Sequence, residues 1–155
     1  MNGLPETRKR VLIVDDEPKI GRILALKLRL SHYEPFVATN GPEALRLVEA
    51  HNPDIMLLDI VMPEMDGCQV LALVRSFSEM PVIVMTALPE SIERAMKLGA
   101  NDSITKPFDP DRLVGRIAAL LAGRDGERGL SRRSGLLSSG GPVAAYLDRA
   151  GSDQG

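Results

Sequence analysis

The stretch Val11-Leu12-Ile13-Val14-Asp15-Asp16 sets four consecutive apolar residues directly before two acids. An uninterrupted apolar run rich in β-branched side chains is typical of a strand that is buried on both faces of a sheet. A short segment of similar character lies at 34–39, and two strongly apolar ones lie at 55–59 and 81–86. A weaker one follows at 103–106. We therefore predict five strands.

Amphipathic segments separate these strands. Apolar residues spaced three and four positions apart predict a helix after each strand. Pro18 suits a first helical turn, and Asp66 suits the N-cap of the third helix. Strands that alternate with helices form a parallel sheet with helices on both faces. The predicted fold class is therefore α/β and doubly wound, and we expect Met56, Met85 and Met96 in its core.

Composition limits the possible functions. The 155 residues are 44% hydrophobic and 26% charged, which fits one soluble domain with a short appendage. A net charge of −2 and 3% aromatic residues argue against direct binding of nucleic acid. No apolar run approaches the roughly 18 residues of a membrane span, and no secretory signal is present. With a single cysteine, Cys68, the sequence predicts a cytoplasmic protein that contacts no membrane.

The character of the sequence changes near Gly123. Eight of the 14 glycines lie from this residue onward, among serines and arginines and without a sustained apolar period. We predict a folded domain over 8–123 and a flexible Gly/Ser/Arg-rich linker or tail over 124–155. Such a tail either leads to an effector beyond this sequence or leaves the domain to act by docking to a partner.

Acidic and polar residues stand at the ends of the predicted strands. Asp15 and Asp16 follow the first strand, Asp59 ends the third, Thr86 the fourth and Lys106 the fifth. Ligands of doubly wound sheets bind at the edge formed by the carboxyl ends of the strands. If the first and third strands are neighbours, three carboxylates converge, and their repulsion requires protons or a divalent cation. Oxygen ligands without His or Cys favour Mg²⁺ over Zn²⁺. A single Asp after a strand commonly only caps a helix, but chance rarely produces the whole set.

These motifs resemble the receiver domain of two-component response regulators. The matching segments are Val-Asp-Asp-Glu-Pro at 14–18, Leu-Leu-Asp-Ile-Val-Met-Pro-Glu-Met-Asp-Gly at 57–67, Met-Thr-Ala at 85–87 and Thr-Lys-Pro-Phe at 105–108. The resemblance covers about 8–123. It implies a flavodoxin-like (βα)5 fold with the strand order 2-1-3-4-5 and a role in phosphorelay signal transduction.

The resemblance also implies a phosphoacceptor and a metal site. Asp59 would accept a phosphoryl group from a sensor histidine kinase or a phosphotransfer protein. Asp16, Asp59 and the backbone carbonyl of Val61 would bind Mg²⁺ directly, and Asp15 would act mostly through a bound water. The domain would catalyse its own phosphorylation, although its main role would be that of a switch.

Further implied roles concern the last two strand ends. Thr86 and Lys106 would contact the phosphoryl oxygens, because phosphoryl transfer needs charge on those oxygens to be neutralised. The Lys106-Pro107 peptide bond is expected to be cis. An acyl phosphate would draw Thr86 toward it and so change an output face made of the fourth helix, the fifth strand and the fifth helix.

The sequence departs from the family at that output face. Ser103 stands where many members have an aromatic residue that turns inward during the switch. The DNA-binding subclass often forms homodimers through charge pairs on this face. Asp102 and Arg116 are retained here, whereas Arg112 replaces an acid and Ile92 lies near the position of a basic partner. A homodimer through this face is the expected mode if one forms.

Other interpretations remain open at this point. Val61 and Leu88 flank the expected phosphoryl site and cannot orient an attacking water, which predicts slow autodephosphorylation. A Mg²⁺-dependent aspartyl phosphatase of the haloacid-dehalogenase type would need an Asp in place of Val61. A flavodoxin-like cofactor binder would need a phosphate loop where the acids at 15–17 repel phosphate. A degenerate receiver that acts as a phosphorylation-independent interaction module is the third alternative.

Overall fold

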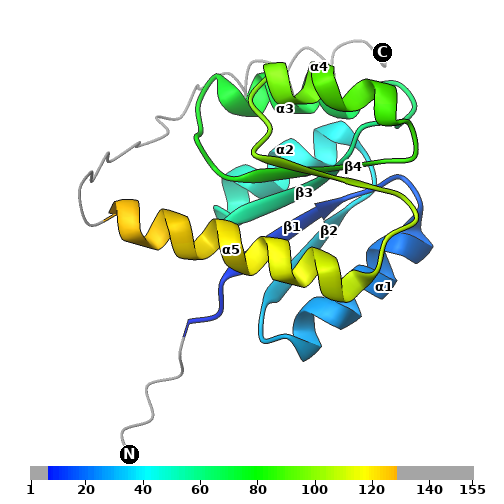
Figure 1. Cartoon of the computed structure of the whole chain (residues 1–155). Helices are drawn as coiled ribbons and strands as arrows, with labels where there is room; N and C mark the ends of the chain where they lie inside the picture. Colours follow the sequence, from blue (N-terminus) through cyan, green and yellow to red (C-terminus); the bar gives the residue numbers. More distant parts are fainter. Residues whose placement is uncertain (1–6, 129–155) are drawn as a thin grey trace, which may run out of the picture.

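The computed structural model describes residues 7–128 and contains one parallel sheet in the order β2-β1-β3-β4-β5 (Figure 1). The strands are β1 (Arg10–Val14), β2 (Glu34–Ala38), β3 (Ile55–Asp59), β4 (Val82–Thr86) and β5 (Asp102–Thr105). The predicted fold class and strand order are therefore confirmed. Most of the predicted tail, from 129 to 155, lies outside the described residues.

Five α-helices and a short 3₁₀ helix connect the strands. They are α1 (Pro18–Leu30), α2 (Gly41–His51), α3 (Gly67–Arg75), η1 (Pro89–Ser91), α4 (Ile92–Lys97) and α5 (Pro110–Arg128). Helices α1 and α5 cover one face of the sheet, and α2, α3 and α4 cover the other (Figure 1). Within residues 7–128, none of the helices has the length and apolar character required to cross a bilayer.

Alternate residues of each central strand enter two separate cores. Leu12 and Val14 of β1 pack with residues of α2 and α3, whereas Val11 and Ile13 pack with residues of α1 and α5. All four side chains are fully buried. Burial on both faces is the physical reason why this strand is continuously apolar instead of alternating.

Local sequence signals fix the starts of the helices. Pro18 occupies the first turn of α1, where the missing backbone N–H costs nothing. The Asn40 side chain accepts a hydrogen bond from the backbone N–H of Glu43 at the start of α2. Asp66 and Gln69 form a reciprocal capping box at the start of α3, as predicted for Asp66.

Helix α5 continues beyond Gly123, the residue at which we placed the domain boundary, and ends at Arg128. Two contacts hold the added turn against the domain. An Arg124 guanidinium nitrogen donates to the carbonyl of Glu79 over 2.6 Å, and Lys9 forms an ion pair with Asp125 at 3.2 Å. These contacts offset the low helix propensity of glycine.

The prediction for Met96 is wrong. Met56 and Met85 are fully buried, but Met96 is 41% exposed. Helix α4 is only six residues long, and Ala95 is its one buried residue. A helix this short presents too narrow a face to bury every apolar residue of its periodic pattern.

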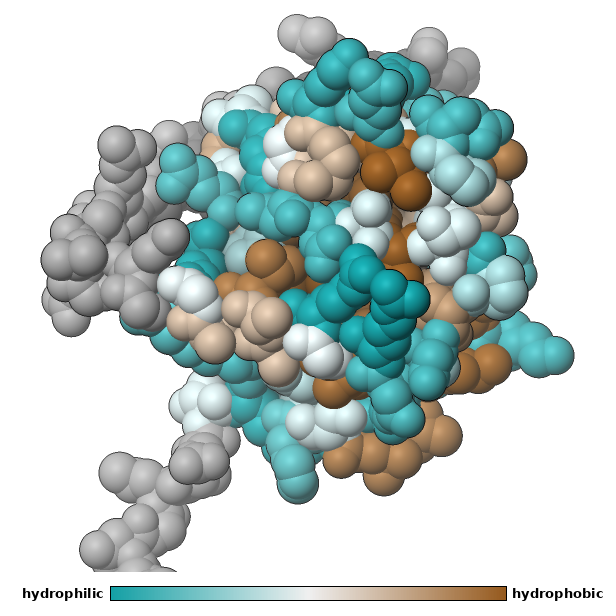
Figure 2. Space-filling view, in the orientation of Figure 1, coloured by the Kyte–Doolittle hydropathy of each residue, from teal (hydrophilic) through white to brown (hydrophobic). Residues whose placement is uncertain are grey.

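Apolar side chains also reach the surface over α1. Ile23, Leu26 and Leu30 are 53%, 57% and 71% exposed and are spaced three and four residues apart. Figure 2 shows apolar surface over this helix, at the lower right of an otherwise mixed and largely hydrophilic face. Helix α1 therefore carries apolar side chains among the charged ones on its exposed side.

Candidate functional site

Sheet register brings the predicted acids together at one edge. Val14 of β1 lies opposite Leu58 of β3, so Asp15 and Asp59 follow at the same level on neighbouring strands. Parallel strands lie about 4.8 Å apart, which places the two side chains within contact range. Asp16 is next in the chain and is half-buried. The three carboxylates that the sequence predicts to converge therefore do so.

The carboxylates of Asp15, Asp16 and Asp59 form a group that fits a small, hard cation. One oxygen of each lies within 4.8 Å of the others. Opposite ligands of an octahedral Mg²⁺ are separated by about 4.2 Å, twice the metal–oxygen distance, so small side-chain movements would complete the fit. Asp15 is fully buried and Asp59 is 4% exposed, so their charges need a counter-ion. The oxygen-only donor set suits Mg²⁺.

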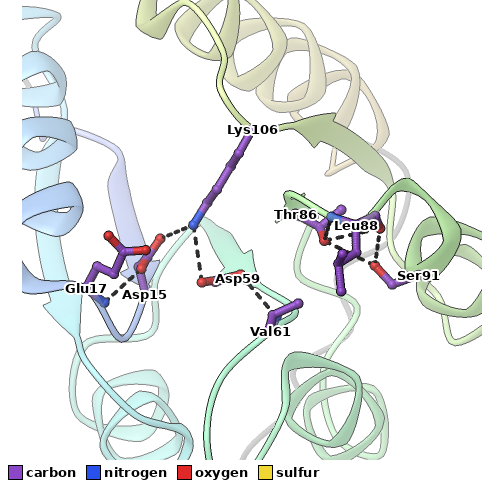
Figure 3. A network of polar contacts seen from close by, with 8 residues as sticks. All are labelled: Asp15, Glu17, Asp59, Val61, Thr86, Leu88, Ser91 and Lys106. Carbon is purple, nitrogen blue, oxygen red and sulfur yellow. Dashed lines mark hydrogen bonds and ion pairs between the residues drawn. The ribbon is translucent and has the colours of Figure 1, made fainter.

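The side chain of Lys106 places a positive charge beside Asp15 and Asp59. The Lys106-Pro107 peptide bond is cis, as expected. Lys106 Nζ donates to Asp15 Oδ2 over 2.7 Å and to Asp59 Oδ2 over 3.2 Å (Figure 3). Burial by itself lowers the pKa of Lys106, but the hydrogen bonds and charges of these two carboxylates outweigh burial and raise it. Lys106 is therefore a firmly protonated bridge between the two acids.

Opposing effects act on the pKa of Asp59. The backbone N–H of Val61 donates to Asp59 Oδ1 over 3.1 Å, which leaves Oδ2 to Lys106. Burial raises the pKa of Asp59 from 3.8 to about 6, with a contribution from the charge of Asp15, and the nearby Lys106 opposes this rise. Near neutral pH the carboxylate is still mostly ionised, and it is poorly hydrated. Such a group is a competent oxygen nucleophile.

The loop from Asp59 to α3 depends on one glycine. A Cβ on Gly67 would lie 2.3 Å from the backbone oxygen of Asp59 and 2.7 Å from Cα of Ile60. The backbone N–H of Gly67 also donates to the carbonyl of Ile60 over 2.8 Å. The Asp-Gly pair at 66–67 therefore serves two purposes, because Asp66 caps α3 and Gly67 lets the helix start against the strand end.

Thr86 is buried at the end of β4, and its hydroxyl is hydrogen-bonded to the residues that follow this strand. Its Oγ1 accepts from the backbone N–H of Leu88 over 2.9 Å and lies 3.2 Å from Ser91 Oγ. Figure 3 shows these three residues as a separate group beside Asp59. Among the described residues, the Thr86 side chain has no hydrogen bond to Asp59 or Lys106, although the Thr86 carbonyl accepts one from the backbone N–H of Lys106. Ser91 was not predicted to contact Thr86, because no sequence pattern reveals which way a threonine hydroxyl turns.

A surface hollow lies apart from this acidic edge. It has a volume of about 420 Å³ and is lined by parts of β5, the loop after it and the start of α5, including Ser103, Arg112 and Arg116. Arg116 donates to Asp102 Oδ1 over 2.9 Å. The hollow is distinct from the carboxylate cluster and belongs to the face that we expect to carry output.

Comparison with known proteins identifies the family. Residues 11–118 match the family described as the response regulator receiver domain. The probable transcriptional regulator ycf27 of Guillardia theta is 43% identical over 118 residues, which are 75% of this chain and 46% of that protein. The transcriptional regulatory protein BaeR of Escherichia coli is 38% identical over 125 residues, which are 78% of this chain and 52% of BaeR. The chain thus spans about half the length of these relatives.

Solved structures agree in fold and in extent. The receiver domain of the Francisella response regulator 1452 is 33% identical with a TM-score of 0.71, covering 76% of this chain and 99% of that one. The response regulator TrrA of Thermotoga maritima, solved in complex with Mg²⁺ and beryllium fluoride, is 34% identical with a TM-score of 0.68, covering 72% and 98%. Sequence, fold and the residues at the strand ends lead to one conclusion: this chain belongs to the receiver domains of two-component response regulators.

Proposed function

We propose that this receiver domain accepts a phosphoryl group on Asp59 and passes the signal to an output partner. The observation that carries the proposal is the cluster of Asp15, Asp16 and Asp59 bridged by Lys106. The donor of the phosphoryl group is the phosphohistidine of a sensor kinase or of a phosphotransfer protein. The family membership supports both parts of this assignment.

The reaction is a phosphoryl transfer between two side chains. A carboxylate oxygen of Asp59 forms a bond to phosphorus as the phosphorus–nitrogen bond of phosphohistidine breaks, and the released imidazole takes up a proton. Mg²⁺, held by Asp15, Asp16, Asp59 and the backbone carbonyl of Val61, would neutralise charge on the phosphoryl oxygens. The fully buried Asp15 contributes its charge to this site without exposing it to solvent.

Lys106 and Thr86 are the protein's own donors for the phosphoryl group. Lys106 Nζ already contacts Asp59 Oδ2, so a short movement brings it to an oxygen of the acyl phosphate. The Thr86 hydroxyl must turn from Leu88 and Ser91 to reach the same group. The turn of Thr86 would couple phosphorylation to the β4–α4 segment and to an output face made of α4, β5 and α5.

The output of the whole protein is also part of this proposal. The matched relatives are named as transcriptional regulators and are about twice as long as the aligned region. We assign any DNA binding by the full protein to a region outside residues 8–123, because a sequence net charge of −2 does not favour the binding of nucleic acid. Asp102 and Arg116 are paired within one chain, and a homodimer through the output face would have to accommodate or exchange that pair.

Mass spectrometry of the intact protein tests the proposal. The protein is incubated with acetyl phosphate, with and without Mg²⁺, and compared with Asp59→Asn and with Asp111→Asn. Asp111 is an exposed aspartate that is ion-paired with Lys27, remote in sequence from the acidic cluster. We expect one added phosphoryl group that requires Mg²⁺, is absent from Asp59→Asn and is retained in Asp111→Asn. Absence of the gain in the unaltered protein would instead favour a phosphorylation-independent interaction module.

A further inference from the structure

We propose that Ser91 is a positioning residue that holds the Thr86 hydroxyl away from the phosphoryl site in the unphosphorylated domain. The inference rests on the proposed function of Thr86 and deepens it by naming the group with which the phosphoryl oxygens compete. Ser91 Oγ lies 3.2 Å from Thr86 Oγ1 (Figure 3), where Thr86 ends β4 and Ser91 ends η1 just before α4.

The donors and acceptors of this segment determine the direction of that contact. Ser91 Oγ donates its one proton to the carbonyl of Leu88 over 2.6 Å. The backbone N–H of Leu88 donates to Thr86 Oγ1, so this oxygen already serves as an acceptor. The Thr86 proton is then directed to Ser91 Oγ at 3.2 Å or to the more distant Leu88 carbonyl at 3.3 Å. Ser91 thus serves both as an acceptor for Thr86 and as a donor to the same turn.

The position of Ser91 in the chain strengthens this interpretation. Ser91 ends η1 and directly precedes α4, and its backbone is already helical, with φ −83° and ψ −13°. Here the Ser91 side chain makes no capping hydrogen bond. Its hydroxyl is engaged with Thr86 and Leu88 instead. Release of Thr86 therefore changes a contact made by the residue from which α4 begins.

The expected size of the effect follows from one neutral hydrogen bond. Such a bond contributes about 0.5–1.5 kcal/mol net, which corresponds to about a two- to tenfold change in an equilibrium. A ligand that binds only when Thr86 has turned gains affinity by the same factor when the competing contact is removed. Ser91→Ala should therefore bind beryllofluoride, a phosphoryl mimic, about two- to tenfold more tightly at saturating Mg²⁺.

A matched control variant is present in the chain. Ser76 Oγ donates to the carbonyl of Leu73 over 2.6 Å, the same three-residue backward bond that Ser91 makes to Leu88, but Ser76 lies at the end of α3. Ser76→Ala should bind beryllofluoride as the unaltered protein does. Ser91→Thr keeps the hydroxyl and should also bind like the unaltered protein, and this variant remains informative if Ser91→Ala folds poorly.

A double-mutant cycle tests whether Ser91 acts through Thr86. The gain in affinity produced by Ser91→Ala should vanish in a Thr86→Ala background. An unchanged or weaker affinity of Ser91→Ala, or a gain that persists without Thr86, would overturn the proposal. So would an equal gain in Ser91→Thr.

A second measurement separates this inference from the proposed function. The side-chain rotamer population of Thr86 can be followed by NMR in the protein without any phosphoryl mimic. Ser91→Ala should shift this population, and Ser76→Ala should not. If Ser91→Ala shifts the Thr86 rotamer population but the unaltered protein does not bind beryllofluoride, the contact between Ser91 and Thr86 is supported and the phosphoacceptor role is refuted. Normal binding by the unaltered protein without any shift would refute the role of Ser91 alone.

Discussion

Lys106 Nζ lies 2.7 Å from Oδ2 of Asp15, which is closer than it lies to Asp59. The Asp15 side chain contacts this ammonium group and has no solvent-accessible surface. In the unphosphorylated domain the lysine thus offsets a buried charge that a divalent cation would also offset. Lys106 and a metal ion are therefore partial competitors for the same carboxylates.

This competition predicts the behaviour of Lys106→Met. Without a metal, loss of the ammonium leaves Asp15 and Asp59 buried without their counter-charge, and the free energy of unfolding should fall by about 3 kcal/mol. Mg²⁺ should bind more tightly to this variant and restore much of the lost stability, because a competing cation has been removed. Urea denaturation in a chelator and at increasing Mg²⁺ concentration measures both effects.

The control for this prediction is Lys97→Met. Lys97 also pairs with an acid, Glu93, but both side chains are more than 70% exposed. Exposed pairs contribute little to stability, so neither stability nor Mg²⁺ affinity should change measurably. Equal Mg²⁺ affinity in Lys106→Met and in the unaltered protein would contradict the competition.

The raised pKa of Asp59 predicts that the stability of the metal-free domain depends on pH. Its pKa is about 6 in the folded domain and 3.8 for an unperturbed carboxyl group, so the folded state binds this proton more tightly. The stabilisation from that proton is complete below pH 3.8 and is lost as the pH rises through 6. Ionised Asp59 should therefore cost on the order of 2–3 kcal/mol at neutral pH.

The variant Asp59→Asn removes this titration. At pH 7.5 in a chelator we expect it to unfold at a higher urea concentration than the unaltered protein, and the difference should shrink toward pH 4. Parallel urea titrations at several pH values measure this convergence. A variant that is less stable at pH 7.5 than the unaltered protein would show that the carboxylate is a net stabiliser and that this sign is wrong.

Sequence patterns predicted the parts of this molecule that depend on periodicity. The buried run at 11–14 and its acidic end identified the first strand and half of the site, because burial on both faces leaves a continuous apolar signature. The sheet then brought Asp15 beside Asp59 through register alone. The buried strand follows from the apolar pattern itself, whereas the adjacency of β1 and β3 was implied only by the resemblance to the receiver family.

Features that depend on side-chain direction or on distant contacts were not accessible. Met96 follows the helical period but lies on a helix too short to bury it. Helix α5 passes Gly123 because Arg124 reaches the carbonyl of Glu79, a contact between residues 45 positions apart. The Thr86 hydroxyl turns toward Ser91 because of the turn between them. Each of these outcomes is decided by three-dimensional contacts that a one-dimensional pattern does not encode.

The backbone at the phosphoacceptor leaves no room for a Cβ at position 67. In Gly67→Ala the new Cβ would meet backbone atoms of Asp59 and Ile60 at 2.3 and 2.7 Å, so the strand end or α3 must shift. We expect destabilisation of about 1–3 kcal/mol or more, together with slower phosphorylation by acetyl phosphate. Urea denaturation and intact-mass time courses measure the two effects.

Gly115→Ala is the matched control for Gly67→Ala. A Cβ at this position meets no atom within 4 Å, and the residue lies inside α5. The substitution should stabilise the domain by about 0.5–1 kcal/mol, because alanine has the higher helix propensity, and it should leave phosphorylation unchanged. Normal phosphorylation and stability in Gly67→Ala would show that the loop adjusts without cost.

Val61 sets the expected lifetime of the acyl phosphate. Its backbone N–H contacts Asp59 Oδ1, and its side chain is 50% exposed beside the site, so water can approach but meets no polar side chain at position 61. Leu88, 44% exposed after β4, is apolar as well. We therefore expect slow loss of phosphate, and Val61→Asn, which can hold a water by hydrogen bonds, should accelerate it about tenfold, below the range of a full general base. Intact-mass time courses after removal of the phosphodonor measure the rate.

Val61→Ala separates orientation of water from access. It enlarges the opening beside Asp59 without adding a hydrogen-bonding group, so its rate should match that of the unaltered protein if orientation controls hydrolysis. Equal acceleration by alanine and asparagine would mean that the valine side chain merely shields the phosphoryl group. Rapid loss of phosphate from the unaltered protein would show that another group orients the water, in which case the lifetime of the signal does not depend on the apolar character of this position.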